Sequence, residues 1–258
     1  IFDIQDVGVR FYTYLSTLHY AMESVSRTNK KIIILDRPNP NSFYIDGPVL
    51  DIKNKSFIGL HPVPIVYGMT IGEYGKMVNG EGWLESDLKA DLEVVKIKNY
   101  NHKSKYEPSI RPSPNLPNLQ SIYLYPSLAF LEKTEVSVGR GTKIQFQVYG
   151  HPDFEKDFYF TPQSNFGSQN PKLKGIKSSG EDLRNYKTIN RIELKWLIKS
   201  YNQFEDKNKF FRNDFDKLAG SSNLKKQIIE GISESEIRDS WQQGLEKFKK
   251  IRKKYLLY

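Results

Sequence analysis

Residues 1–40 read IFDIQDVGVRFYTYLSTLHYAMESVSRTNKKIIILDRPNP, and this stretch decides the fold class. Residues 1–4 are apolar and strand-like, and residues 32–35 are a short β-branched run typical of a strand buried in a parallel sheet. Between them, apolar side chains recur at helical spacing at Leu15, Leu18, Met22 and Val25. A strand, a helix and a strand in so short a stretch predict a βαβ unit and therefore an α/β fold.

The loops that follow these two strands carry most of the polar side chains of the stretch. In a βαβ unit the strands are parallel, so their carboxyl ends open on the same edge of the sheet. We therefore expect the loop with Asp6 and Arg10 and the loop with Asp36, Arg37 and Asn39 to face one crevice.

The remainder of the chain continues the alternation and then becomes less regular. The further elements predicted are strands at 63–67, 92–97 and 144–149 and helices at 71–79, 126–131, 191–204, 222–231 and 234–257. Two of these helices begin with a capping-box pattern, at Thr70 with Glu73 and at Ser233 with Glu236. Residues 99–117 are rich in Asn, Lys, Ser and Pro, which is typical of a crossing between domains.

The net charge of +9 admits a nucleic-acid or membrane surface as partner, and its distribution favours another explanation. Residues 245–258 hold six basic residues and one acidic residue, so +5 of the +9 lies in one terminal segment. Apolar residues recur there at helical spacing, at Trp241, Leu245, Phe248, Ile251 and Tyr255. This pattern predicts a docked helix whose lysines face water.

Several classes of protein and site are excluded or disfavoured by composition. The chain has no cysteine, which excludes disulfides and Cys-ligated metals, and its four histidines show no metal-binding spacing. No apolar run approaches the roughly 20 residues of a membrane-spanning helix. Nucleotide-phosphate loops and a GxSxG elbow do not occur, so no cofactor or metal is indicated.

The stretch DIQDVGVRFYTY (3–14) places two carboxylates, an amide, a guanidinium and two phenols at one strand end. Asp3 and Asp6 either cap the following turn and pair with Arg10, or they line a polar pocket. Residues 36–39 have the same two interpretations, a local ion pair in a rigid turn or part of the pocket. The spacing alone leaves these alternatives open.

Two further residues carry a structural and a functional interpretation. Glu73 fits the capping box, and it is also a carboxyl group available for acid–base chemistry. Arg140 lies between two glycines in SVGRGT (137–142), which suits either a close approach of the backbone to a ligand or a plain turn.

Taken in order, the motifs resemble the NamZ (YbbC-like) exo-β-N-acetylmuramidases, glycoside hydrolases of bacterial cell-wall recycling, in the versions found in the Bacteroidetes. The matching stretches are DIQDVGVRFYTY (3–14), LDRPNPNSFYIDGPVL (35–50), HPVPIVYGMTIGEYGKMVNGEGWL (61–84), PSPNLPNLQSIYLYPS (112–127) and VSVGRGT (136–142), with FDKLAGSSNLKKQI and SWQQGLEKFKKIRKKYLLY near the end. The resemblance spans essentially the whole chain, and several long motifs in register are more specific than any single one.

The resemblance implies a Rossmann-like N-terminal domain, which we place at 1–105, and a smaller α+β C-terminal domain at 106–258, with the active-site cleft between them. It implies hydrolysis of N-acetylmuramic acid from the non-reducing end of peptidoglycan fragments, in a periplasmic or secreted setting, without a cofactor. Muramyl saccharides are then the expected partners, and nucleic acid is not. A non-catalytic protein that binds muramyl sugars is the alternative.

Members of the family carry a further segment upstream of DIQDVG, with a P-E-H-G-like stretch whose glutamate is the favoured acid/base. The resemblance therefore implies that the Rossmann-like domain is incomplete within residues 1–258. Since hydrolysis of a glycosidic bond usually needs two carboxyl groups, Asp6 is the first candidate here for the second one, and Glu73 follows.

A muramyl sugar differs from a glucosaminyl sugar by a lactyl carboxylate, which a planar guanidinium recognises well. We expect Arg140 or Arg10 to bind this group, with Tyr12 and Tyr14 against the sugar. The predicted substrate-binding residues are Arg10, Tyr12, Tyr14, Asp36, Arg37, Asn39, Asn115, Ser137, Arg140 and Thr142.

Overall fold

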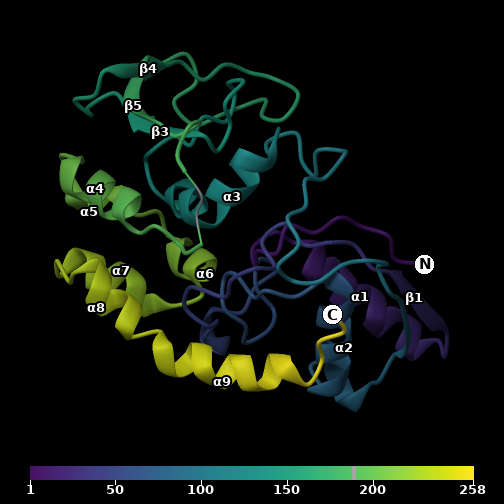
Figure 1. Ribbon diagram of the computed structural model, residues 1–258. Coiled ribbons are helices and arrows are strands. Elements are labelled where there is room, and N and C mark those ends of the chain that lie inside the picture. The colour runs from purple at the N-terminus through teal and green to yellow at the C-terminus, as the bar shows by residue number, and fades with distance from the viewer. Residues whose placement is uncertain (188–189) are drawn as a thin grey trace. The chain divides into compact units, whose positions relative to one another are not determined.

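The computed structural model describes residues 1–187 and 190–258, which form two compact units (Figure 1). Unit 1 comprises Ile1–Tyr106 together with Arg238–Tyr258, and unit 2 comprises Glu107–Ile237. The sequence analysis places the whole of 106–258 in a second domain, whereas by its contacts the C-terminal segment of the chain belongs to unit 1. The structure has the mixed α/β composition expected from the first forty residues.

Unit 1 is built on a parallel pair of strands, β1 (Lys31–Leu35) and β2 (Asp91–Val95), in the register Lys31↔Asp91 to Leu35↔Val95. Phe2 forms an isolated parallel bridge with Ile34 of β1. The predicted parallel arrangement is therefore present, although residues 1–4 pair through this one bridge and do not form an extended strand. The predicted strand at 63–67 is likewise reduced to bridges, in which Val66 pairs with Val9 and Asp46.

Two helices pack on these strands, α1 (Tyr14–Arg27) and α2 (Ile71–Gly80). The capping box predicted at Thr70 and Glu73 is present at the start of α2. Gly75 allows α2 to approach β1 closely, because a Cβ atom there would lie 2.8 Å from Cδ1 of Ile34. Apolar side chains of both helices and of β1 form one buried core.

The predicted helix at 234–257 is two helices, α8 (Glu234–Asp239) and α9 (Gln242–Lys253), separated at Ser240 and Trp241. The capping contacts predicted between Ser233 and Glu236 precede α8. Phe248 of α9 is buried in the core of unit 1, and the lysines of the helix are exposed, as expected for a docked helix. Figure 1 shows the end of α9 next to α2, where the hydroxyl of Tyr255 donates to Glu81 at 2.6 Å.

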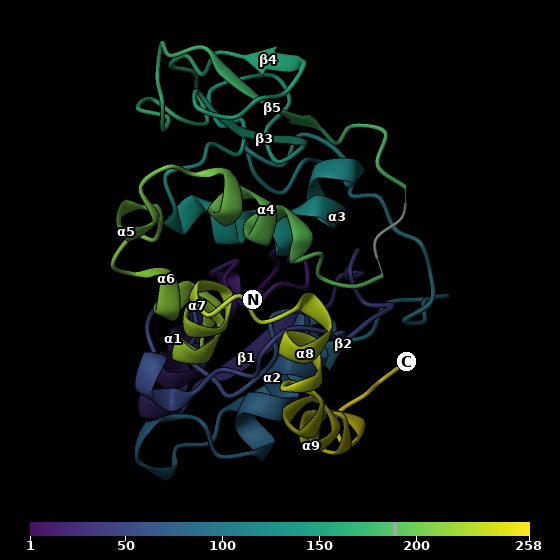
Figure 2. The same ribbon diagram turned by 90° about the vertical axis from the view of Figure 1, so that its left-hand side faces the viewer.

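Unit 2 contains an antiparallel sheet in the order β3-β5-β4, and α3 and α4 lie on one side of it (Figure 2). Its elements are α3 (Leu119–Leu128), η3 (Ala129–Lys133), β3 (Val148–His151), β4 (Phe158–Phe160), β5 (Ser178–Asp182), α4 (Lys195–Gln203), α5 (Lys207–Phe210), α6 (Phe215–Ala219) and α7 (Ser222–Ile229). Unit 1 also has the short helices η1 (Ile52–Asn54) and η2 (Glu85–Asp87).

The helices predicted at 191–204 and 222–231 are present as the shorter α4 and α7. Two other predictions for unit 2 differ from the structure at their boundaries for reasons visible in the backbone. The helix predicted at 126–131 begins earlier, at Leu119, because Asn118 and Ser121 form a reciprocal cap. The strand predicted at 144–149 begins only at Val148, because Phe146 has a φ of 52° and interrupts the extended backbone.

Candidate functional site

Asp6 lies in the loop after the first bridge of unit 1 and is buried. Its Oδ2 accepts hydrogen bonds from the backbone N–H of Gly8, at 2.7 Å, and from the hydroxyl of Tyr67, while Oδ1 has no hydrogen-bond partner among the described residues. Burial raises the pKa of Asp6 to about 6. Asp6 thus caps its own turn, as the structural interpretation proposed, and it also has a pKa suited to proton transfer near neutrality.

Arg10 is buried and binds backbone. Its Nη1 donates to the carbonyl oxygens of Pro48 and Val63, at 3.0 and 2.8 Å. Burial lowers the pKa of Arg10 to about 9. The guanidinium therefore fixes the segments around residues 48 and 63, whereas Arg37 lies half-exposed and pairs with Asp3 at 2.6 Å.

Asp36 follows β1 and binds two other segments of unit 1. Its carboxylate accepts from Thr70 Oγ1 at 2.6 Å, from the backbone N–H of Gly72 at 2.8 Å and from the hydroxyl of Tyr258 at 2.8 Å. Burial raises the pKa of Asp36. This side chain therefore anchors the start of α2 and the last residue of the chain to the end of β1.

Asn39 joins the two loops that the sequence analysis expected to face one crevice. Its Nδ2 donates to the carbonyl of Met69 at 2.8 Å, and its Oδ1 accepts from the N–H of Asn41 at 2.8 Å. Gly8, with a φ of +75°, lies against it so closely that a Cβ atom would overlap the amide group of Asn39. The structure thus brings the loops of Asp6 and Asn39 together, with a glycine required at the contact.

Glu73 is fully buried, and both of its carboxylate oxygens are bonded within unit 1. Oε2 accepts from the N–H of Thr70 at 2.9 Å and from Nε2 of His102 at 2.8 Å, and Oε1 accepts from the N–H of Leu257 at 2.7 Å. The capping interpretation is confirmed, and the same side chain also holds the C-terminal end of the chain.

Tyr12 and Tyr14 lie at the start of α1, where both are half-buried. Their rings meet edge to face, with centroids 5.1 Å apart. They are the aromatic side chains nearest in sequence to Asp6 that remain partly accessible, as the predicted sugar contacts require.

In unit 2, three loops are knit together by side-chain and backbone hydrogen bonds. We call residues 111–117, 137–145 and 163–168 the loop cluster. Asn115 donates from Nδ2 to the carbonyl of Gly167 at 2.7 Å, and Asn165 donates from Nδ2 to the carbonyl of Thr142 at 3.3 Å. The structure therefore brings together Asn115 and Thr142, two predicted site residues that are distant in sequence.

The SVGRGT motif within this cluster is a turn held by its own side chains. Thr142 Oγ1 donates to the carbonyl of Gly139 at 2.6 Å, and Ser137 Oγ accepts from the N–H of the same glycine at 3.2 Å. Arg140 forms a two-pronged ion pair with Glu132, in which Nη2 and Oε2 are 2.9 Å apart, and its guanidinium lies over the ring of Phe146. The motif is therefore a turn, in line with the plain-turn interpretation. The guanidinium of Arg140 is bonded to the carboxylate of Glu132.

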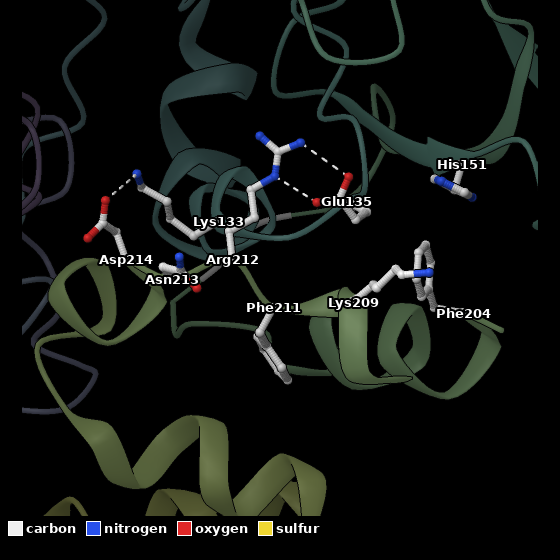
Figure 3. Close-up of a pocket in the computed structure, with 9 residues that line it drawn as sticks. All are labelled: Lys133, Glu135, His151, Phe204, Lys209, Phe211, Arg212, Asn213 and Asp214. Atoms are coloured by element: carbon white, nitrogen blue, oxygen red, sulfur yellow. Dashed lines mark hydrogen bonds and ion pairs between the residues drawn. The ribbon is translucent and has the colours of Figure 1, made fainter. Parts of the chain in front are cut away.

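Sequence analysis missed the hollows of unit 2, which include one of about 560 Å³ with Tyr159 and Lys177 in its lining. Of two others, the larger, of about 750 Å³, is shown in Figure 3, where Arg212 is paired with Glu135 and Lys133 with Asp214. The smaller, of about 270 Å³, lies in the loop cluster. Of the predicted site residues only Thr142 lines any of these hollows. The periodicity of apolar residues, which locates strands and helices, does not indicate hollows formed between loops.

It also missed a buried chain of hydrogen bonds in unit 1. Tyr74 Oη lies 2.9 Å from Nδ1 of His61, whose Nε2 lies 3.0 Å from Nδ1 of His19, whose Nε2 lies 3.1 Å from Oε1 of Glu23. The only sequence signal was the helical spacing of His19 and Glu23 on one face of α1. Within the described residues, no group of three or more His, Cys, Asp or Glu side chains is arranged to hold a metal ion.

Comparison with known proteins identifies the class. Family models of the N-terminal and C-terminal parts of the exo-β-N-acetylmuramidase NamZ match residues 1–120 and 123–258. The fold and motifs are thus those of a family of glycosidases. The chain belongs to the NamZ family.

Three relatives illustrate how far the similarity extends. The peptidoglycan β-N-acetylmuramidase NamZ of Bacillus subtilis (strain 168) is 34% identical over 282 residues, which cover all of this chain and 67% of that protein. Crystal structures of two DUF1343 family proteins from Bacteroides fragilis NCTC 9343 match 99% of this chain. The first matches with a TM-score of 0.96 and 46% identity, over 74% of its own chain. The second matches with a TM-score of 0.85 and 26% identity, over 73% of its own chain.

Proposed function

We propose that the protein is a glycoside hydrolase that releases N-acetylmuramic acid from the non-reducing end of peptidoglycan fragments, in the periplasm or outside the cell. Membership of the NamZ family and the name of the Bacillus relative support the substrate class. In the parts of the chain that the structure describes, no helix is long and apolar enough to cross a membrane.

The observation that carries the mechanism is the buried carboxyl group of Asp6 with its raised pKa. A glycosidase usually needs one carboxylic acid that protonates the leaving oxygen and one carboxylate that attacks or activates water. With a pKa of about 6, Asp6 is largely ionised at pH 7, yet basic enough to accept a proton from an attacking water. We assign it the second role, and the resemblance assigns the acid to the glutamate of the upstream segment.

The proposal retains only some of the predicted substrate contacts. Tyr12 and Tyr14 remain as contacts with the sugar, since both are partly accessible. Arg10 and Arg140 are not retained as readers of the lactyl carboxylate, because Arg10 is bonded to two backbone carbonyls and Arg140 to Glu132. We treat Asp36, Asn39 and Glu73 as structural residues, because their side chains are bonded to backbone groups of unit 1.

The test is hydrolysis of a chromogenic β-N-acetylmuramide beside the matching N-acetylglucosaminide, with residues 1–258 and with a chain extended by the upstream segment that the resemblance implies. Asp6→Asn in the extended chain should lower kcat by about a hundredfold or more, the usual contribution of a positioned acid or base. Asp3→Asn is the matched control, because this half-exposed carboxylate lies three residues away and, among the described residues, pairs only with Arg37. Equal activity of the Asp6 variant and the control would contradict the assignment.

A non-catalytic muramyl-binding protein is the second candidate, favoured by one observation. Both oxygens of Glu73 are bonded internally, and Oδ1 of Asp6 is buried, so neither carboxylate presents a free oxygen to solvent. Binding of muramyl saccharide by the extended chain without any release of product would support this candidate.

A further inference from the structure

We propose that the hollow of the loop cluster in unit 2 binds the carboxylate-bearing part of the saccharide, with Arg111 and Lys143 as its cations and Phe166 as its platform. The inference rests on the proposed function for the identity of the sugar, since an acidic saccharide is the substrate class proposed there. It replaces Arg10 and Arg140, which the sequence analysis had assigned to the carboxylate.

The first support is the shape of the hollow. Its volume is about 270 Å³, below the roughly 300–1,000 Å³ of sites that enclose drug-sized ligands, so it suits one sugar ring or its acidic side group. The residues that line it are Arg111, Pro114, Pro117, Thr142, Lys143, Gln145, Asn165, Phe166 and Gly167. They come from all three loops of the cluster, so the hollow exists only when these loops are joined.

The second support is the way the Phe166 ring is held. The side chain is 89% exposed, and it lies at the tip of a tight turn in which Asn165 and Ser168 exchange backbone hydrogen bonds of 3.0 and 3.2 Å. Asn115 fastens the same turn by donating to the carbonyl of Gly167 at 2.7 Å. A ring on a fixed turn at the edge of a hollow offers a rigid apolar face, on which the C–H face of a sugar can lie with little loss of side-chain entropy.

The third support is the availability of two cations. Both Arg111 and Lys143 are exposed, and among the described residues neither has a carboxylate within ion-pair distance. The larger hollow of unit 2 differs in this respect, because Arg212 is bonded there to Glu135 at 2.8 Å. An unpaired guanidinium binds a carboxylate through two parallel hydrogen bonds, which makes Arg111 the stronger of the two cations.

The fourth support is a pair of buried acceptors without donors. Gln145 and Asn115 are each 7% exposed, and Oε1 of Gln145 and Oδ1 of Asn115 have no hydrogen-bond partner in the described structure. Gln145 lines the hollow, and Asn115 lies behind it, bonded to Gly167 of the lining. Buried polar atoms are nearly always satisfied, so the open oxygen of Gln145 marks a place for a donor from a ligand or water. The hydroxyl and acetamido N–H groups of an amino sugar supply such donors.

The experiment compares the binding of N-acetylmuramic acid and N-acetylglucosamine by calorimetry, with the extended chain and its variants. The double variant Arg111→Ala/Lys143→Ala should weaken the binding of N-acetylmuramic acid about tenfold or more and leave N-acetylglucosamine nearly unchanged, because a hydrogen bond to a charged group is lost. Phe166→Ala should weaken both sugars alike. These three side chains are exposed, so the variants are expected to fold, and unfolding curves check this.

The matched controls are Lys177→Ala and Tyr159→Ala. This lysine lies 4.2 Å from the centroid of a 55% exposed tyrosine ring in the same unit, and neither residue lines the hollow. If the double variant and the Lys177 control give the same ratio of the two affinities, the inference is wrong. It is equally contradicted if the unaltered chain does not prefer the acidic sugar.

The outcome is separable from that of the proposed function. Suppose the double variant changes the ratio of the two sugar affinities, and the chain hydrolyses neither glycoside. This result supports the proposed binding site and contradicts the proposed enzymatic activity. Hydrolysis of the muramide by a chain whose affinity ratio is unchanged in the double variant supports the enzymatic activity and contradicts the proposed binding site.

Discussion

The strand-end loops of unit 1 and the loop cluster of unit 2 contain similar polar side chains and use them differently. In unit 1, Asp36, Asn39 and Glu73 are bonded to backbone and to the C-terminal end of the chain. In unit 2, Arg111 and Lys143 border a hollow without an ion-pair partner among the described residues. The difference indicates that a polar residue at a strand edge can hold the scaffold, and the cations left open are the ones we propose for ligand binding.

The largest effect should follow from removing the most heavily bonded carboxylate. Glu73→Ala leaves the N–H groups of Thr70 and Leu257 and the ring of His102 without their acceptor in a buried place. We expect the free energy of unfolding to fall by about 3 kcal/mol or more, measured by urea unfolding. Glu85→Ala, which removes an exposed ion pair with Arg27, is the control and should cost less than about 1 kcal/mol. Similar losses in both variants would break the comparison.

One lysine of unit 2, Lys172, is bonded to backbone groups, as Asp36, Asn39 and Glu73 are in unit 1. Its removal should give the next largest loss of stability. Lys172 donates from Nζ to the carbonyls of Leu131 at 3.0 Å and Val136 at 2.8 Å, and also to those of Glu132 and Thr134. Lys172→Met keeps the aliphatic length and leaves these acceptors unpaired. The expected loss is about 2 kcal/mol in urea unfolding. An unchanged midpoint would show that water replaces the ammonium.

The histidine chain of unit 1 predicts how stability depends on pH. Since the carboxylate of Glu23 can only accept, His19 donates to it from Nε2, His61 donates to His19, and Tyr74 donates to His61, with both rings neutral. Burial lowers the pKa of His61 to about 3, against about 6.5 in the unfolded chain. The unfolded state therefore binds more protons as the pH falls from about 6.5 towards 3, and stability is lost over this window.

The expected loss is up to about 1.4 kcal/mol per pH unit for one histidine, measured as the urea midpoint between pH 7.5 and 5. Asp6 acts in the opposite direction, because its raised pKa of about 6 adds stability as the acid is protonated in the folded state. The Asp6→Asn variant should therefore lose stability more steeply towards acid than the unaltered chain. Parallel curves would show that the two groups do not titrate as their burial requires.

The smallest effect should be at the open cation. Arg111→Ala removes an exposed side chain that has no ion pair within residues 1–187 and 190–258, so the free energy of unfolding should change by less than about 0.5 kcal/mol. The comparison is sharpest when this variant and Glu73→Ala are measured side by side. A loss from Arg111→Ala as large as that from Glu73→Ala would show that the guanidinium supports the loops and is not held open for a ligand.

The sequence was informative where structure depends on neighbouring residues. The periodicity of residues 1–40 predicted the parallel core, and the spacing of Thr70 and Glu73 predicted a cap that is present. The loop of Asp6 was likewise expected beside that of Asn39, because the geometry of a βαβ unit leaves few other places for it.

Features that depend on distant contacts were not predicted. Helical spacing in α9 shows which face is apolar, and it does not show against which core that face packs. The bond from Asn115 to Gly167 joins turns 52 residues apart, and Phe166 carries no local signal that it would stand exposed beside a hollow. Whether a charged side chain is open or bonded, as with Arg111 and Arg140, depends on where a partner such as Glu132 lies in space.

The return of Arg238–Tyr258 to unit 1 has a consequence for the order of events during synthesis. All of Glu107–Ile237 leaves the ribosome before α9 does, so unit 2 can complete its core while the chain is still growing. Residues 1–106 emerge before unit 2, yet they lack Phe248 and the cover over α2 until α9 has been synthesised. Of the two units, the one that emerges first is therefore the last to complete its core, and during that interval its apolar surface is the part most in need of a chaperone.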